Sequence, residues 1–107
     1  MRRTGKRRPS TLEEAVGQIL LEHREELGLS QMDLAVAAGY SLRYIGDVER
    51  GTKSATMRTM NDLATLLDVS LGSLILEAEE LLLASRRLRK RPTAGKARQL
   101  KGRTTRV

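Results

Sequence analysis

The stretch AGYSLRYIGDVERG, residues 38–51, contains the side chains whose types and spacing best suit recognition chemistry. Arg43 and Asp47 are spaced four residues apart, so on a helix they share a face and can form an ion pair. An exposed guanidinium can also donate two hydrogen bonds to the edge of a guanine, which gives about 1–3 kcal/mol of discrimination. The segment therefore indicates either a nucleic-acid-binding surface or an ordinary solvated ion pair.

The composition offers little to an enzyme or a metal site. The chain includes no Cys and a single His, which excludes disulfides and thiolate metal sites and leaves little for a zinc site or a histidine-based triad. The acidic clusters EHREE and EAEE fit solvated helix faces, and we find no Gly-rich phosphate-binding loop. We expect no enzymatic activity, no cofactor and no metal.

Charge is divided unevenly along the chain. Five basic residues fall in 1–10 and ten in 85–107, whereas residues 11–84 hold all thirteen acidic residues and five basic ones. Cationic ends on a compact body are typical of nucleic-acid-binding proteins, because phosphate contacts release counterions. A solubilising tail would have the same composition, so charge alone leaves both interpretations open.

No apolar run reaches the length of a membrane span, and the basic N-terminus leads into no apolar segment. We therefore expect a soluble cytoplasmic protein with no membrane partner, associated with the nucleoid if its partner is DNA.

The same short helical pattern recurs along the chain. A Ser or Thr suited to an N-cap precedes each apolar periodic segment, and a glycine follows three of these segments. The N-cap candidates are Thr11, Ser30, Ser41, Thr56 and Ser70, and the terminating glycines are Gly28, Gly39 and Gly51. The predicted helices span 11–27, 30–37, 41–50, 56–67 and 70 to about 90. Without strand-like alternation, Phe or Trp, the chain is predicted to be all-α, with an aliphatic core.

The predicted fifth helix is longer than a small bundle requires. Its apolar residues follow heptad-like spacing to about residue 90, and an exposed leucine stripe on a small domain needs a cover. We therefore favour a dimerisation surface formed by Leu74, Ala78, Leu81, Leu82 and Leu88. A longer core helix would show the same pattern.

Composition divides the chain into four parts. These are a basic arm (1–10), the bundle (11–76), the extension of the fifth helix (77–91) and a basic tail (92–107). Because Pro and Gly follow the last periodic residues, we expect 92–107, and also 1–9, to be disordered in the free protein.

The helices at 30–37 and 41–50, joined by about three residues that include Gly39, have helix-turn-helix spacing. The segments GLSQMDLAVAAGYSLRYIGDVERG and TMRTMNDLATLLDVSLGSLI resemble the phage repressor and Cro type of helix-turn-helix protein, the XRE family. This resemblance covers the chain from Val16 to Leu76. It implies a compact five-helix bundle of the lambda-repressor-like DNA-binding type, with the 41–50 helix in the major groove of double-stranded DNA.

Leu42, Arg43 and Asp47 are the candidate base-reading residues, because Ile45 and Val48 form the inward-facing pair of the same helix. Arg43 can contact a guanine, and Leu42 can press on a thymine methyl group. Asp47 can hold the Arg43 guanidinium in place or accept from a cytosine amino group. We favour the orienting role, since an isolated acid facing phosphates is repelled.

The resemblance also implies contacts to the DNA backbone, which position a protein without reading sequence. The candidates are Gln31, Tyr44, Arg50, Thr52 and Lys53. Arg24 and Glu49 match family positions that pair in a partly buried salt bridge, and we assign them to structure.

Three further residues need interpretation. Tyr40 fits core packing better than a DNA contact. His23 stands where relatives usually carry Leu, which indicates a satisfied semi-core histidine, with a pH-sensitive core as the alternative. Gly46 weakens its helix by roughly 1 kcal/mol relative to alanine, and we infer that it lets the backbone approach a phosphate or a thymine closely.

These features predict a sequence-specific transcriptional regulator of a prokaryote or phage, acting as a homodimer on a palindromic operator. One alternative is an antitoxin or restriction-modification controller that works with a partner protein bound through 77–107. Another is a protein–protein coactivator or adaptor of the same fold, which would prefer no DNA site.

Overall fold

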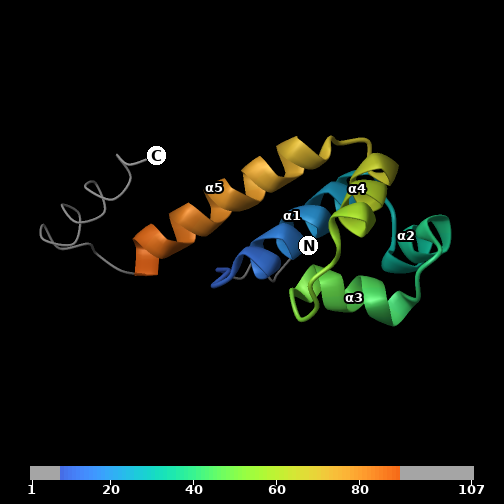
Figure 1. The fold of residues 1–107 in the computed structure, drawn as a ribbon, viewed down its shortest axis with the longest axis horizontal. Helices are drawn as coiled ribbons and strands as arrows, with labels where there is room; N and C mark the ends of the chain where they lie inside the picture. The colour runs from blue at the N-terminus through green and yellow to red at the C-terminus, as the bar shows by residue number, and fades with distance from the viewer. Residues whose placement is uncertain (1–7, 90–107) are drawn as a thin grey trace, which may run out of the picture.

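The structure, a computed structural model, describes residues 8–89. Within this range it contains five α-helices and no strand, as the sequence predicts. The helices are α1 (Leu12–Glu26), α2 (Gln31–Ala38), α3 (Leu42–Arg50), α4 (Met57–Leu66) and α5 (Leu71–Arg89). Figure 1 shows α1 between α5 on one side and α3 on the other. The basic tail and most of the basic arm lie outside the described residues.

Each helix begins at a side-chain N-cap that the sequence predicts. The hydroxyls of Thr11, Ser30, Ser41, Thr56 and Ser70 each accept a hydrogen bond from the backbone N–H three residues later. At Ser30 the bond is reciprocal, because the Asp33 carboxylate accepts from the Ser30 backbone N–H at 2.9 Å. These caps stabilise their helices by about 1 kcal/mol each, which explains why such short helices begin where they do.

The largest fully buried aliphatic side chains of the core come one from every helix. These five residues are Leu20, Leu34, Ile45, Leu63 and Leu74. Burying a side chain of this size contributes roughly 1.5–3 kcal/mol. The shared core therefore fixes α3 relative to the other four helices.

The apolar stripe of α5 belongs to this core, which corrects the predicted dimerisation surface. Leu74 and Ala78 are completely buried, and Leu82 is 8% exposed. Leu81 is partly buried against the same cluster, whereas Leu88 is 68% exposed. The heptad-like spacing is therefore that of the inward stripe of an ordinary amphipathic helix. Leu74, Ala78 and Leu82 are covered by the same chain and cannot contact a second copy.

Pro9 is ordered, although the sequence predicts disorder there. Pro9 is fully buried, and its carbonyl oxygen accepts a hydrogen bond from the buried Ser85 hydroxyl at 2.9 Å. This contact attaches the residues before α1 to the last turns of α5, and it corrects the expectation that disorder extends to Pro9.

Gly17 sets the distance between α1 and α3, a role that the sequence did not suggest. A β-carbon at this position would lie 2.4 Å from the carbonyl oxygens of both Val48 and Glu49. Only glycine therefore allows the two helices to approach this closely. The sequence indicates this role only by placing a glycine inside a predicted helix.

No helix within residues 8–89 combines the length and the apolar character needed to cross a membrane.

Candidate nucleic-acid interface

The outward face of α3 is set by the residues that the helix buries. Ile45 is completely buried and Val48 is 3% exposed, as the predicted inward pair. On the other side, Leu42 is 43% exposed and the Arg43 side chain is 89% exposed. Leu42 and Arg43 therefore project from the bundle at the first turn of the helix, where base-contacting residues of such helices lie.

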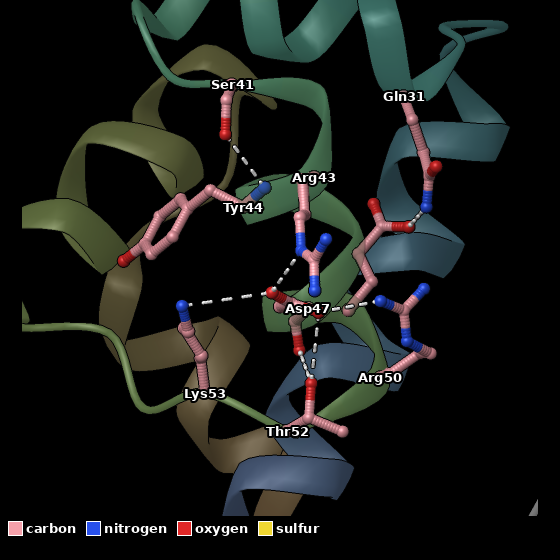
Figure 2. Close-up of polar contacts among 9 residues, drawn as sticks. Gln31, Ser41, Arg43, Tyr44, Asp47, Arg50, Thr52 and Lys53 are labelled. Carbon is pink, nitrogen blue, oxygen red and sulfur yellow. Dashed lines mark hydrogen bonds and ion pairs between the residues drawn. The ribbon is translucent and has the colours of Figure 1, made fainter.

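Asp47 is less exposed than the sequence predicts, because neighbouring side chains cover it. Its side chain is 12% exposed, and its Oδ1 lies 2.7 Å from Arg50 Nη2. Its Oδ2 lies 3.9 Å from both Arg43 Nε and Lys53 Nζ. Figure 2 shows the carboxylate among these three cations. Arg50, and not Arg43, makes the short contact with Asp47.

The charges around Asp47 change its titration. Burial acts to raise the pKa of Asp47, but the hydrogen bond from Arg50 and the charges of Arg50, Lys53 and Arg43 outweigh it. The pKa of Asp47 therefore lies below its ordinary value, and the residue is a carboxylate at neutral pH.

The turn after α3 folds back onto the same residue. The Thr52 backbone N–H and hydroxyl both donate to the Asp47 carbonyl oxygen, at 3.0 and 3.1 Å. Gly51 makes this reversal possible with a φ of 77°, in the left-handed region. The turn thereby brings Lys53 to the same surface as Arg43 and Arg50.

This surface gathers most of the positive charge of an otherwise acidic body. Residues 11–84 contain five basic residues, and three of them, Arg43, Arg50 and Lys53, surround Asp47. Such a local excess of cations is the electrostatic feature that polyanion binding requires.

Behind the surface, Arg24 and Glu49 form the ion pair that the resemblance implied. Arg24 Nε lies 2.6 Å from Glu49 Oε2, with side chains only 8% and 1% exposed. The hydrogen bond to Glu49 raises the pKa of Arg24, against the opposing effect of burial. Gln31 joins this pair by donating to Glu49 Oε1 at 2.9 Å. Gln31 is thus tied to Glu49 at the start of α2.

The two tyrosines pack against each other at the start of α3. Their ring centroids are 5.1 Å apart, and the Tyr40 hydroxyl lies 2.9 Å from Thr59 Oγ1. Tyr40 therefore has the packing role expected of it, linking the turn to α4. Tyr44 is half-buried, and Figure 2 shows its hydroxyl directed away from Asp47.

Gly46 and His23 both receive a structural explanation. A β-carbon at position 46 would lie 3.2 Å from Arg50 Nη1, so the glycine leaves room for that guanidinium. His23 Nε2 lies 2.7 Å from Glu77 Oε1, with a side chain 22% exposed. This bond ties α1 to α5 and makes His23 the satisfied semi-core residue that was expected.

Among residues 8–89, no group of three or more His, Cys, Asp and Glu side chains is arranged to hold a metal ion.

Known proteins are similar to this chain in sequence and in fold. A helix-turn-helix family model matches residues 20–74, about half of the chain. Transcriptional regulator ClgR of Mycobacterium tuberculosis (strain ATCC 25618 / H37Rv) is 29% identical over 84 residues, which cover 78% of this chain and 75% of the relative.

Two solved structures extend the similarity to the fold. The clp gene regulator ClgR from Corynebacterium glutamicum matches with a TM-score of 0.67 and 27% identity, over 76% of this chain and 86% of that one. The restriction-modification controller protein C.AhdI from Aeromonas hydrophila matches with a TM-score of 0.55 and 39% identity, over 57% of this chain and 92% of that one.

Proposed function

The chain belongs to the helix-turn-helix family of DNA-binding transcriptional regulators, of the repressor and Cro-like (XRE) type, and on this premise we propose that α3 reads base pairs in the major groove of an operator. The observation that carries the proposal is the surface around Asp47, where Arg43, Arg50 and Lys53 lie on the outward side of α3 and its following turn. The protein acts by binding, without catalysis, at the nucleoid in the cytoplasm.

The proposed contacts follow from the placement of each side chain. Leu42 and Arg43 project furthest and contact base edges, and Asp47 orients its cationic neighbours. We assign the phosphate contacts to Gln31, Tyr44, Arg50, Thr52 and Lys53. Arg50 and Lys53 lie beside Asp47, and Gln31 is bonded to Glu49.

A homodimer fits both the size of the surface and the chemistry of α5. One such unit buries little DNA surface, and a two-fold dimer would read half-sites roughly 34 Å apart. On the solvent side of α5, Leu83 is 50% exposed between the exposed residues Glu80 and Arg86. In an antiparallel α5 pair centred on Leu83, Glu80 of each copy faces Arg86 of the other, so the charges are complementary.

A restriction-modification controller is the second candidate function, because C.AhdI is 39% identical over its shared region. Both candidates require sequence-specific DNA binding by α3. An operator located beside restriction and methyltransferase genes would favour the controller. A partner protein bound through 77–107, as in an antitoxin, would be revealed by co-purification.

Selection of randomised duplex DNA by the purified full chain tests the proposed function. We expect enrichment of one two-fold symmetric sequence with half-sites about one helical turn apart. Failure to enrich any sequence, with binding that depends only on salt, would contradict base reading and would favour an adaptor or coactivator of the same fold.

A further inference from the structure

Arg50 lies on the outward face of α3, folded back over Gly46. A β-carbon at position 46 would lie 3.2 Å from Arg50 Nη1 and 3.7 Å from its Cζ, so the guanidinium covers the turn before its own Cα. Long side chains on a helix lean toward its N-terminus and cover the preceding turn in this way. Glycine leaves the space open at a position where any longer side chain would occupy it.

Asp47 holds the Arg50 guanidinium in this position. Its Oδ1 accepts from Arg50 Nη2 at 2.7 Å, while its Oδ2 lies 3.9 Å from Arg43 Nε. One carboxylate therefore contacts two guanidinium groups on the same helix face (Figure 2). The Arg50 side chain nevertheless stays 54% exposed, so it remains available to a ligand.

The remaining donors of Arg50 suit a base edge. A guanidinium has five N–H donors arranged along two bidentate edges, and the bond to Asp47 uses one donor. One complete edge is left, and the hydrogen bond to the carboxylate holds the guanidinium beside α3. Phosphate and guanine can both accept two hydrogen bonds from a guanidinium. We favour the base because Arg50 shares Asp47, and therefore one face of α3, with Arg43.

We propose that Arg50 is a second base-reading residue, which contacts a guanine in the same half-site as the base contacted by Arg43. Asp47 is the positioning residue for both guanidinium groups, and Gly46 provides the space. This inference rests on the proposed function, and it replaces the phosphate contact there assigned to Arg50.

The test measures the binding of Arg50→Ala to the preferred site of the wild-type chain and to each single base-pair variant of that site. We expect discrimination to fall roughly 5- to 150-fold at one base pair, distinct from the base pair that loses discrimination in Arg43→Ala. Lys53→Ala is the matched control, because it removes the same charge beside Asp47 and should weaken binding to all variants evenly.

If Arg50→Ala weakened binding equally to every DNA variant, and reduced the slope of log K against log salt concentration by about 1, Arg50 would contact a phosphate. That result would overturn the inference. A second variant, Asp47→Asn, keeps the size of the side chain and removes the charge that holds the guanidinium. Its helical content should persist while discrimination at the Arg50 base pair falls, and unchanged discrimination would also overturn the inference. A wild-type chain without any preferred site would instead contradict the proposed function itself.

Discussion

Arg24 of α1 and Glu49 of α3 are joined by two hydrogen bonds in the interior of the bundle, at 2.6 and 3.0 Å. A third bond runs from Arg24 Nη1 to the Leu29 carbonyl oxygen at 2.7 Å, just before α2. The pair therefore connects α1, α3 and the turn before α2, and it fixes the C-terminal end of α3, whose other face carries the cations around Asp47.

Arg24→Ala should lower the free energy of unfolding by about 3–5 kcal/mol, because it leaves the Glu49 charge buried without its partner. Urea denaturation measures this loss. The double substitution Arg24→Met with Glu49→Met should recover much of it, since no charge is then left in the interior. A loss below about 1 kcal/mol in Arg24→Ala would be typical of an exposed pair and would contradict this prediction.

Arg43→Ala should reduce the preference for the operator more than it reduces the weaker binding to random DNA. The lost contact corresponds to about 1–3 kcal/mol of discrimination at one base pair, which competition between operator and random duplexes measures. Arg58→Ala is the control, because it removes the same charge from an exposed position on α4. Equal losses on both kinds of DNA would show that Arg43 reads no base.

Asp47→Asn should make stability less dependent on pH under acidic conditions. The folded-state pKa of Asp47 is lowered, so its contribution is present above the unfolded value of roughly 3.9 and is lost as the pH falls through the folded-state pKa. Wild-type stability should therefore decrease from about pH 4 downward, and urea titrations at a series of pH values would record a shallower decrease in the variant. Identical pH profiles for the two proteins would contradict the prediction.

Leu83→Glu should convert the proposed dimer to monomers with little change in helical content, because the side chain is half exposed in the single copy. Sedimentation velocity measures the assembly. Glu80→Arg should weaken the dimer through facing like charges, and Glu80→Arg combined with Arg86→Glu should restore it. Dimers that persist in Leu83→Glu would place the interface elsewhere.

Deletion of 92–107 should flatten the salt dependence of DNA binding. This segment contains five basic residues, and each phosphate contact contributes about 0.9 to the slope of log K against log salt concentration. Binding measured at several salt concentrations gives the slope for both chains. An unchanged slope would mean that the segment makes no phosphate contacts.

The helices were predictable from the sequence because local chemistry determines them. An N-cap hydroxyl before each helix and a glycine after α2 and α3 act over a few residues, so the bounds of α2 and α3 follow from the residues around Ser30, Ser41, Gly39 and Gly51. The exposed positions of Leu42 and Arg43 follow in turn from the periodicity of α3.

What the sequence could not indicate depends on contacts between distant segments. The stripe of α5 has the same spacing whether it faces α1 or a second copy of the chain, and only the packing shows that Leu74, Ala78 and Leu82 are internal. The distribution of contacts around Asp47 depends on side-chain conformation, because Arg43 and Arg50 are both within its reach along one helix.

The hydrogen bond between Ser85 and Pro9 brings together two positions separated by 76 residues. Each position borders one of the two stretches that carry the fifteen basic residues of the chain's ends. The bond therefore holds the two points from which these stretches continue next to each other on the bundle. If one stretch bound a polyanion, the other would be at a raised local concentration beside it, as in bivalent binding.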